Sequence, residues 1–264
     1  MVSRPGILAE IIEHKRAETG ARRAARPLAE IRRDAEDAPP GRPFADRVAT
    51  DHPAVIAEIK KASPSEGVIR ADFDPRAIAA DYASAKASCL SVLTDERFFC
   101  GDDAHLVAAR AACALPVLRK DFIVDEYQVY ETRALGADCL LLIVAALEPA
   151  QLVDFNRLAQ DIGLDVLIEV HDRSELSRAL ALEPRIVGIN NRDLATFTTR
   201  LETTLDLLDD VPDDVGVVTE SGIHTPQDVC RMLDAGVNAF LVGTAFMRAA
   251  SPGTALQRLF GWAT

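Results

Sequence analysis

The chain has 264 residues, the size of one large domain or two small ones, and 48% of them are hydrophobic, which is ample for a core. Its net charge of −12 disfavours a nucleic-acid surface and an anionic membrane face as partners. The N-terminus lacks the apolar core of about 7–15 residues that marks a signal peptide, and no run reaches the ~18 apolar residues of a membrane span. We therefore expect a cytoplasmic protein that binds neither nucleic acid nor membranes.

The cysteines and histidines bear on the redox compartment and on metal binding. The five cysteines are scattered and none belongs to a CxxC pair, and the five histidines show no ligand spacing. This pattern predicts reduced thiols and no metal site.

Residues 1–50 predict an N-terminal helical extension. Ile7, Leu8, Ile11 and Ile12 form a stripe with helical spacing, and Pro39-Pro40-Gly41 marks a bend. We expect the extension to cover one end of the domain that follows.

Eight short apolar runs come next, and their starts lie about 20 to 35 residues apart, which leaves room for one helix each time. The expected strands cover residues 55–60, 89–93, 117–120, 139–143, 166–170, 186–189, 215–219 and 239–242. Helical spacing fills the segments between them, as in Leu152, Phe155, Leu158, Ala159 and Ile162.

Three junctions repeat a glycine that precedes a strand. Gly136, Gly163 and Gly236 each stand where a helix ends and a left-handed residue is favoured. Repeated helix–glycine–strand junctions indicate a parallel sheet, and eight such units predict an α/β fold of the (β/α)8 TIM-barrel type. No G-x-G-x-x-G follows the first strand, which disfavours a dinucleotide-binding sheet. We expect a single domain over residues 1–264, with residues 1–50 as its extension.

The first strand carries two charged residues in an otherwise buried pattern. In "AEIKKASPSEG", Glu58 and Lys60 are two residues apart and therefore share one face of the strand. Burying both charges costs several kcal/mol per ion unless they are paired and hydrogen-bonded. The pair is therefore either a structural ion pair or part of a catalytic site.

Polar residues recur at the carboxyl ends of the other strands, where TIM barrels carry their active sites. A lone charged residue there is usually solvated, so the hypothesis of a site depends on the whole set. The set comprises Glu58, Lys60, Ser63, Lys120, Glu169, Asn190, Arg192, Glu220, Ser221, Gly222, Gly243 and Thr244. His171, just after the fifth strand, is expected to be a loop residue or a support for the site rather than a catalyst.

The glycines after the seventh and eighth strands predict a phosphate site. Gly222 and Gly243 let backbone N–H groups approach an anion closely, and Ser63 is expected across the mouth. A phosphorylated small-molecule substrate follows from this placement.

Several of these segments together resemble the indole-3-glycerol phosphate synthase family of tryptophan biosynthesis. The segments are "EIKKASPS", "LRKDF", "GINNRDL", "VLIEVHD" and "TESGIHTPQDV", and the resemblance covers nearly the whole chain. It implies a carboxy-lyase that converts 1-(2-carboxyphenylamino)-1-deoxyribulose 5-phosphate into indole-3-glycerol phosphate, with loss of carbon dioxide and water and without a cofactor. A monomer or weak homodimer is expected.

The resemblance also implies roles for individual residues. Lys120 protonates the ketone oxygen and Lys60 pairs with the substrate carboxylate, although the reverse assignment of the two lysines is an alternative. Glu169 is the base of the dehydration. Orienting and binding roles fall to Glu58 and Asn190 (substrate orientation), Arg192 (carboxylate), Ser63, Gly222, Gly243 and Thr244 (phosphate), Phe99, Phe122 and Leu141 (anthranilate ring), and Glu220 and Ser221 (substrate).

Three positions depart from the family pattern. Cys100 stands where an amide is usual, Asp102 where Ser is common, and Glu66 where Lys is frequent. Asp102 is expected to cap the next helix as Ser would. Cys100 is expected to alter a loop hydrogen bond, and Glu66 to lower the positive charge near the mouth.

Three other functions compete with this hypothesis. A phosphosugar isomerase would need a Cys/Asp or Asp/Asp pair where this chain has Glu and Lys. A Schiff-base aldolase would need an unprotonated lysine, for which Lys60 beside Lys61 is a candidate, and borohydride trapping would reveal it. A non-catalytic phosphosugar sensor would bind the ligand without turnover.

Overall fold

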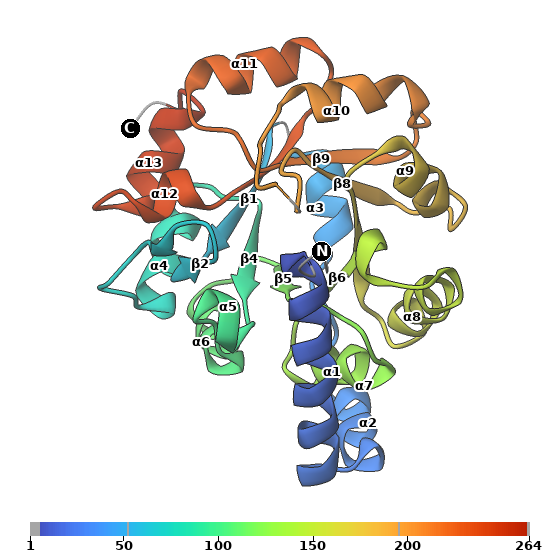
Figure 1. The fold of residues 1–264 in the computed structure, drawn as a ribbon. Coiled ribbons are helices and arrows are strands. Elements are labelled where there is room, and N and C mark those ends of the chain that lie inside the picture. Colours follow the sequence, from blue (N-terminus) through green and yellow to red (C-terminus); the bar gives the residue numbers. More distant parts are fainter. Residues whose placement is uncertain (1–5, 52, 195, 263–264) are drawn as a thin grey trace, which may run out of the picture.

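The computed structural model describes residues 6–51, 53–194 and 196–262 and contains a closed barrel of parallel strands surrounded by helices (Figure 1). The strands follow one another around the barrel in the order β1-β4-β5-β6-β7-β8-β9-β10, and β10 pairs with β1. This confirms the predicted (β/α)8 architecture. The barrel strands are β1 (Ala54–Ile59), β4 (Cys89–Leu93), β5 (Val117–Lys120), β6 (Cys139–Ile143), β7 (Asp165–Val170), β8 (Ile186–Asn190), β9 (Gly216–Glu220) and β10 (Ala239–Val242).

Helices alternate with the strands and cover the outside of the barrel (Figure 1). The main ones are α4 (Pro75–Ser84), α6 (Asp103–Ala112), α7 (Glu126–Ala134), α8 (Pro149–Asp161), α9 (Arg173–Leu180), α10 (Glu202–Leu207), α11 (Pro226–Asp234) and α13 (Pro252–Leu259). Shorter turns lie in the loops: α5 (Glu96–Phe99), α12 (Thr244–Met247), η1 (Val144–Ala146) and η2 (Leu208–Asp210).

The alternation of side chains along each strand separates two kinds of core. On β1, Ile56 points into the barrel, whereas Val55 and Ala57 point outward to the helices. The interior cluster also takes one or two residues from each neighbouring strand, for example Leu118 on β5 and Leu167 on β7. Any residue two positions after these also points inward, at the carboxyl-terminal mouth of the barrel.

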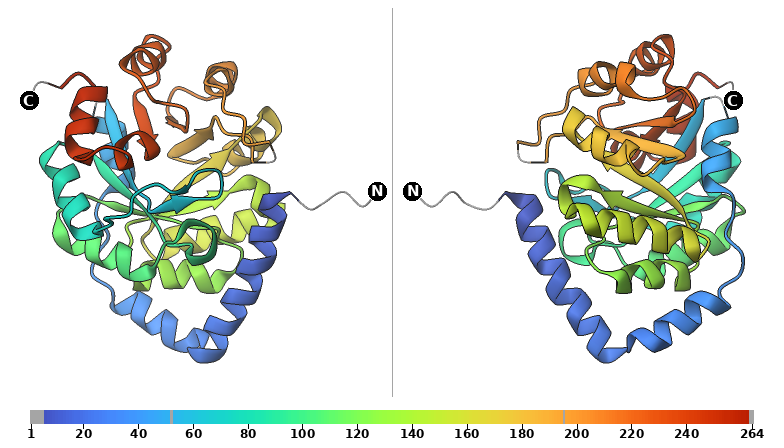
Figure 2. Two further views of the ribbon diagram at one scale, coloured as in Figure 1. Left: turned by 60° about the vertical axis from the view of Figure 1, so that its left-hand side comes forward. Right: turned by 90° about the vertical axis from the view of Figure 1, so that its right-hand side faces the viewer.

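The N-terminal extension wraps from one end of the barrel to the other. It consists of α1 (Ile7–Ala25), α2 (Leu28–Asp37) and α3 (Phe44–Thr50), and α1 and α2 form a V beside the barrel (Figure 2). Ile11 of α1 joins the interior cluster from the mouth, and α2 packs against α7. Phe44 and Val48 of α3 join that cluster from the opposite end, next to the start of β1. The predicted helical stripe and bend are both present.

The predicted glycine junctions adopt the expected conformation. Gly136, Gly163 and Gly236 follow α7, α8 and α11 with φ of +83°, +78° and +90°, which lie in the left-handed region that glycine enters without a steric penalty. These glycines end each helix and direct the chain into the next strand.

Two local features differ from the predicted elements. Residues after β1 form a small antiparallel hairpin, β2 (Ala62–Ser63) and β3 (Gly67–Val68), where a loop was expected. In addition, β8 and β9 each extend one residue beyond the predicted strand, to Asn190 and Glu220, because these two residues pair in register. Both differences lie at the mouth of the barrel.

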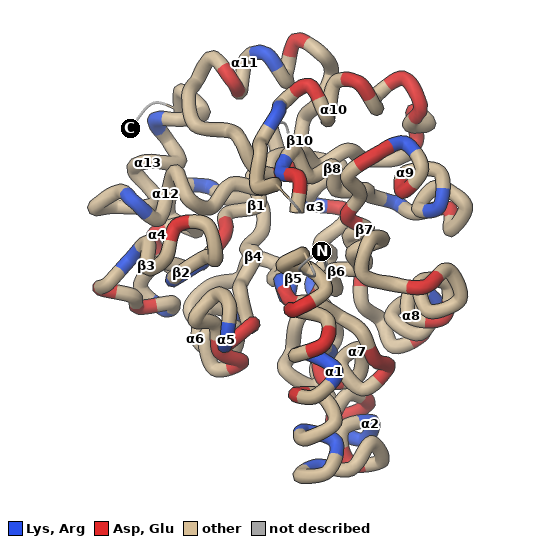
Figure 3. Tube along the Cα trace, in the orientation of Figure 1, with Lys and Arg blue, Asp and Glu red and all other residues tan. Residues whose placement is uncertain are grey.

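The outer surface carries both signs of charge, with several acidic residues along α10 (Figure 3). Within the described ranges, no helix has the length and apolar character needed to span a membrane. The five cysteines are free.

Candidate active site

Strand periodicity brings a group of charged side chains into the mouth of the barrel. Glu58 follows the inward Ile56 by two residues, and Lys60 follows Glu58 by two more. The same spacing places Lys120 after Leu118 and Glu169 after Leu167. The polar residues therefore occupy the last inward layer above the apolar interior.

Lys120 lies at the centre of this layer. Its Nζ donates to Oε2 of Glu169 at 2.6 Å and lies 3.5 Å from Oε2 of Glu220. Burial disfavours the ammonium form, but the carboxylates of Glu169, Glu220 and Glu58 outweigh it and raise the pKa of Lys120 well above its usual range. Lys120 is therefore a charged, partly buried proton donor that lines the mouth.

Glu169 is almost completely buried and has cationic neighbours at both oxygens. Lys120 occupies Oε2, while Oε1 accepts from Nδ2 of Asn190 at 3.1 Å and lies 3.3 Å from Nε2 of His171. Burial disfavours the carboxylate, but the charge of Lys120 and the contact with His171 lower the pKa of Glu169 far below its ordinary value. Glu169 is thus an ionised carboxylate at neutral pH.

Glu220 has the opposite character. Burial, reinforced by the charges of Glu169 and Glu58 and opposed by Lys120, raises the pKa of Glu220 to about 8. Its Oε1 is buried and has no hydrogen-bond partner within the described residues. Gly188 on β8 makes room for this side chain, because a Cβ at position 188 would overlap the Glu220 carboxyl group.

Glu58 and Lys60, the two charged residues at the end of the first strand, form an ion pair with each other. Nζ of Lys60 lies 2.5 Å from Oε2 of Glu58, and their side chains are 14% and 6% exposed. Gly243, after β10, makes room for this pair because a Cβ there would overlap the Glu58 carboxylate. The two charges are paired with each other and open to the mouth.

The backbone after β9 turns through two left-handed residues. Ser221 has φ of +60° and Gly222 has φ of +87°. Consecutive unusual backbone conformations of this kind can direct neighbouring N–H groups to one side, which suits an anion. Ser63, Gly222, Gly243 and Thr244 all line the same cavity, as the sequence predicted.

Apolar side chains form the other wall of the mouth. The rings of Phe99 and Phe122 lie 6.1 Å apart between centroids, and Leu141 of β6 lies below them. Leu8 and Ile11 of α1 complete this wall.

All of these groups line one cavity at the carboxyl ends of the strands, which we call the mouth cavity. Its lining includes every residue that the sequence analysis placed in the site: Glu58, Lys60, Ser63, Phe99, Lys120, Phe122, Leu141, Glu169, Asn190, Arg192, Glu220, Ser221, Gly222, Gly243 and Thr244.

Comparison with known proteins decides the family. The family described as indole-3-glycerol phosphate synthase matches residues 8–259 of the chain. The chain belongs to the indole-3-glycerol phosphate synthase family. This family consists of lyases of tryptophan biosynthesis, and the assignment favours that reaction over the isomerase and aldolase alternatives.

Relatives with this name match over almost their full length. The indole-3-glycerol phosphate synthase of Laribacter hongkongensis is 57% identical over 96% of this chain and 98% of its own. That of Acidithiobacillus ferrooxidans is also 57% identical, with the same coverage. Among solved structures, the N-acetylmannosamine-6-phosphate 2-epimerase from Clostridium perfringens matches with a TM-score of 0.62 at 13% identity, over 84% of this chain and 97% of that one, which shows the shared barrel fold.

Sequence reasoning missed several members of the synthase site. Leu8 and Ile11 were recognised as a helical stripe but not as part of the mouth cavity. Gly188 was not singled out, although an isolated glycine inside a strand signals that another group approaches closely. His171 was expected to be a loop or supporting residue, and it contacts Glu169 without lining the mouth cavity.

The three departures from the synthase pattern have clear positions. Asp102 caps α6 by accepting from the N–H of Ala104 at 2.7 Å, as expected. Cys100 ends α5 in the left-handed region, with φ of +52°, and is exposed. Glu66 forms an ion pair with Arg248, so an arginine compensates its charge.

Proposed function

We propose that the chain closes the indole ring of 1-(2-carboxyphenylamino)-1-deoxyribulose 5-phosphate and releases carbon dioxide and water. The observation that carries this proposal is the partly buried ion pair of 2.6 Å between Nζ of Lys120 and Oε2 of Glu169. It supplies an acid and a base at one point, beside an apolar wall and a cationic patch. The reaction needs these elements and no cofactor or metal.

Ring closure requires a proton at the ketone oxygen. The anthranilate carbon that bears the carboxylate attacks the ketone, and the developing alkoxide takes the proton of the Lys120 ammonium. The paired carboxylates keep Lys120 charged until substrate arrives. Loss of carbon dioxide from the same ring carbon then restores an electron pair to the ring.

Dehydration requires a base and an acid. Glu169 takes a proton from the methylene carbon next to the ring nitrogen, and the electron pair of that C–H bond forms the last double bond of the indole ring. The hydroxyl group formed from the ketone takes a proton from the Lys60 ammonium and departs as water. Once Lys120 has given up its proton, Glu169 loses one cationic neighbour and becomes a stronger base. The order of the two proton transfers thus follows from the pairing of the two side chains.

The remaining lining residues hold the substrate in this proposal. Lys60 and Arg192 pair with its carboxylate, and Arg192 is held by a bond from its Nη1 to Oγ of Ser65 at 3.1 Å. Glu58 orients Lys60, and Asn190 orients Glu169. The phosphate lies at Ser63, Ser221, Gly222, Gly243 and Thr244, the ring lies between Phe99, Phe122 and Leu141, and Glu220 contacts the substrate hydroxyl groups.

Charge supports a substrate with several negative charges. Below pH 8 Glu220 is neutral, so Lys60, Lys120 and Arg192 face the carboxylates of Glu58 and Glu169, while the charge of Asp121, which also lines the cavity, is compensated by Lys15 and Arg119. The mouth cavity is then locally positive in a chain whose net charge is −12. Such a patch attracts a substrate that carries both a phosphate and a carboxylate, although the protein as a whole is negatively charged.

The first experiment is a direct assay. Purified protein receives the carboxyphenylamino-deoxyribulose phosphate with a metal chelator present, and the growth of indole fluorescence is followed. We expect rapid product formation, with Lys120→Met and Glu169→Gln each reducing kcat by at least about 10²-fold. Binding of the substrate without product would contradict the proposal and favour a non-catalytic sensor.

We also infer that the protein acts in the cytoplasm as a single domain of residues 1–264 and as a monomer or weak homodimer. The free cysteines suit a reducing compartment. The exposed large apolar residues Val68, Val107, Val153 and Phe197 are far apart in the sequence, and the high negative charge opposes self-association. Light scattering across a concentration series tests the oligomeric state, and a stable higher oligomer would contradict the inference.

A further inference from the structure

His171 follows β7 and lies behind Glu169, on the side away from the mouth cavity. Its Nε2 is 3.3 Å from Oε1 of Glu169 and has no other partner among the described residues. The ring itself is only 13% exposed. Glu169 therefore has Lys120 on one oxygen, facing the mouth cavity, and an imidazole on the other.

Glu175 fixes the orientation of this imidazole. Its Oε2 accepts from the backbone N–H of His171 at 2.8 Å and lies 3.0 Å from Nδ1 of the ring. Glu175 stands in the first turn of α9, and its own N–H donates to the capping Asp172 at 2.8 Å. Two contacts to one residue hold the ring and leave Nε2 at 3.3 Å from Oε1 of Glu169, an ion-pair distance without the geometry of a hydrogen bond.

The imidazole lines a cavity other than the mouth cavity. His171 and Glu175 line a second cavity, which we call the side cavity, together with Asn191 and Arg200. Asn190 borders both cavities, whereas His171 does not line the mouth cavity. A substrate in the mouth cavity would therefore touch Glu169 but not His171.

We propose that His171, held by Glu175, is a positioning residue that fixes Oε1 of Glu169 and so presents Oε2 to Lys120 and the substrate. This inference rests on the proposed role of Glu169 as the base. It deepens that proposal by assigning the orientation and charge state of Glu169 to two residues outside the mouth cavity.

The charges around His171 decide its protonation. Burial disfavours its cation, but the interactions with Glu169 and Glu175 raise the pKa of His171 to about 10. The charged groups around it are Glu169 on β7, Glu175 on α9, Glu220 on β9, and Asp172, Asp193 and Arg200 in the side cavity, with Lys120 of β5 on the other oxygen of Glu169. At neutral pH the ring is an imidazolium, which keeps Glu169 ionised after Lys120 has released its proton.

The test compares His171→Ala, His171→Gln and Glu175→Gln with wild type. We expect His171→Ala to lower kcat about 10- to 100-fold while KM stays within about twofold, because the side chain supports a reacting group and does not touch the substrate. Gln at position 171 keeps a donor without the charge, so we expect it to retain more activity than Ala. His171→Ala and His171→Gln both remove the imidazolium charge that lowers the pKa of Glu169. The acid limb of the kcat–pH profile should therefore move to higher pH in these two variants.

The coupling between the two residues gives a second readout. Because Glu175 acts through His171, the double variant His171→Ala/Glu175→Gln should be no slower than His171→Ala alone. His105→Gln, which changes a histidine on α6, is the matched control and should keep wild-type kinetics. Circular dichroism and thermal unfolding of each variant identify any loss of fold, in which case His171→Gln and Glu175→Gln carry the test.

Two failures can be told apart. If wild type forms no product, or if Glu169→Gln is as active as wild type, the proposed function or the role of Glu169 is wrong. If those results are as expected but folded His171→Ala keeps wild-type kcat and pH profile, only the positioning role is overturned. If KM rises by the same factor by which kcat/KM falls, kcat is unchanged. That result would also overturn the positioning role, because it would indicate that His171 binds the substrate directly.

Discussion

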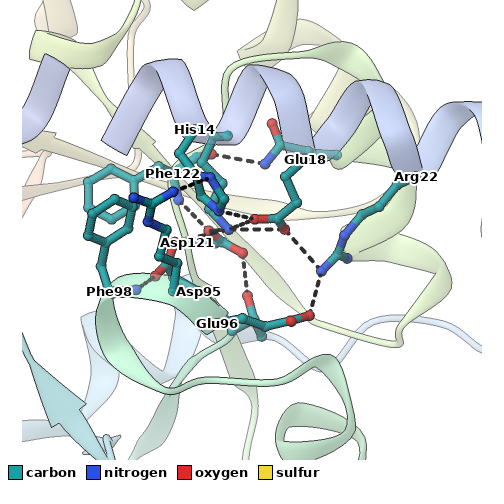
Figure 4. A network of polar contacts seen from close by, with 12 residues as sticks. His14, Glu18, Arg22, Asp95, Glu96, Phe98, Asp121 and Phe122 are labelled. Carbon is teal, nitrogen blue, oxygen red and sulfur yellow. Dashed lines mark hydrogen bonds and ion pairs between the residues drawn. The ribbon is translucent and has the colours of Figure 1, made fainter. Parts of the chain in front are cut away.

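Nζ of Lys15, on α1, lies 3.0 Å from Oδ1 of Asp121, the residue that follows Lys120 at the end of β5. Figure 4 shows Asp121 beside α1, the helix that carries His14, Glu18 and Arg22. The same Nζ lies 3.1 Å from Oδ2 of Asp95, which caps the short helix that carries Phe99. Lys15 is completely buried. The N-terminal extension is thus joined by a buried charge to two segments that line the mouth cavity.

The first prediction concerns this buried lysine. Lys15→Met should lower the free energy of unfolding by about 3–5 kcal/mol, because it leaves Asp95 buried without its cation and Asp121 with Arg119 alone. Urea unfolding followed by circular dichroism measures the change. Arg16→Met is the matched control, since Arg16 is the exposed neighbour on the same helix. Equal stability of the two variants would show that the buried pairs contribute nothing.

Much of this architecture was predictable from sequence because it depends on local patterns. The eight strands follow from apolar runs at regular spacing, and the three helix-ending glycines follow from the preference of glycine for positive φ. The gathering of Glu58, Lys120 and Glu169 follows from strand periodicity combined with the rule that barrel sites lie at the carboxyl ends of strands.

The rest depends on distant contacts that carry no local signal. Lys15 lies on a helix whose spacing shows an apolar stripe, and nothing near it in the sequence indicates that Asp95 and Asp121 surround it. Likewise, the raised pKa of Glu220 arises from burial and from carboxylates on β7 and β1, which only the closed barrel brings together. The β2–β3 hairpin was missed because each strand has only two residues.

The second prediction concerns the pair on the first strand. Glu58→Gln and Lys60→Met should each remain folded but lose at least about 10²-fold in kcat, because each removes a charge from the mouth cavity rather than from the apolar interior. Steady-state assays with circular dichroism as a check on folding measure this. Lys86→Met, at an exposed lysine, should remain fully active. Wild-type turnover in either variant would remove that residue from the proposed mechanism.

The third prediction concerns pH and Glu220. In the folded protein this carboxyl keeps its proton up to about pH 8, whereas in the unfolded chain it loses it near the ordinary value of 4.5. The folded state therefore binds more protons in this interval, and the contribution of Glu220 to stability falls as pH rises from 4.5 to 8. Glu220→Gln removes this fall, so its advantage in Tm over wild type should grow from pH 5 to pH 9. Parallel Tm–pH curves would contradict the assignment.

Substrate affinity should follow the same ionisation. Above pH 8 the ionised Glu220 adds a negative charge beside a substrate that is itself anionic, so KM of wild type should rise. In Glu220→Gln this alkaline rise should be absent, even if kcat is reduced. Measuring KM and kcat from pH 6 to 9.5 in both proteins separates the alkaline loss of affinity from any loss of turnover.

The last prediction concerns Gly243. A Cβ at this position would overlap the Glu58 carboxylate, so Gly243→Ala should displace Glu58 from Lys60 and reduce kcat/KM. Gly20 on α1 is the matched control, because a Cβ there meets no atom within 4 Å. Gly20→Ala should stabilise the helix by about 0.5–1 kcal/mol and leave kinetics unchanged. If Gly243→Ala instead keeps full activity, then Glu58 can move without consequence, and the close approach of this glycine is not required for its role.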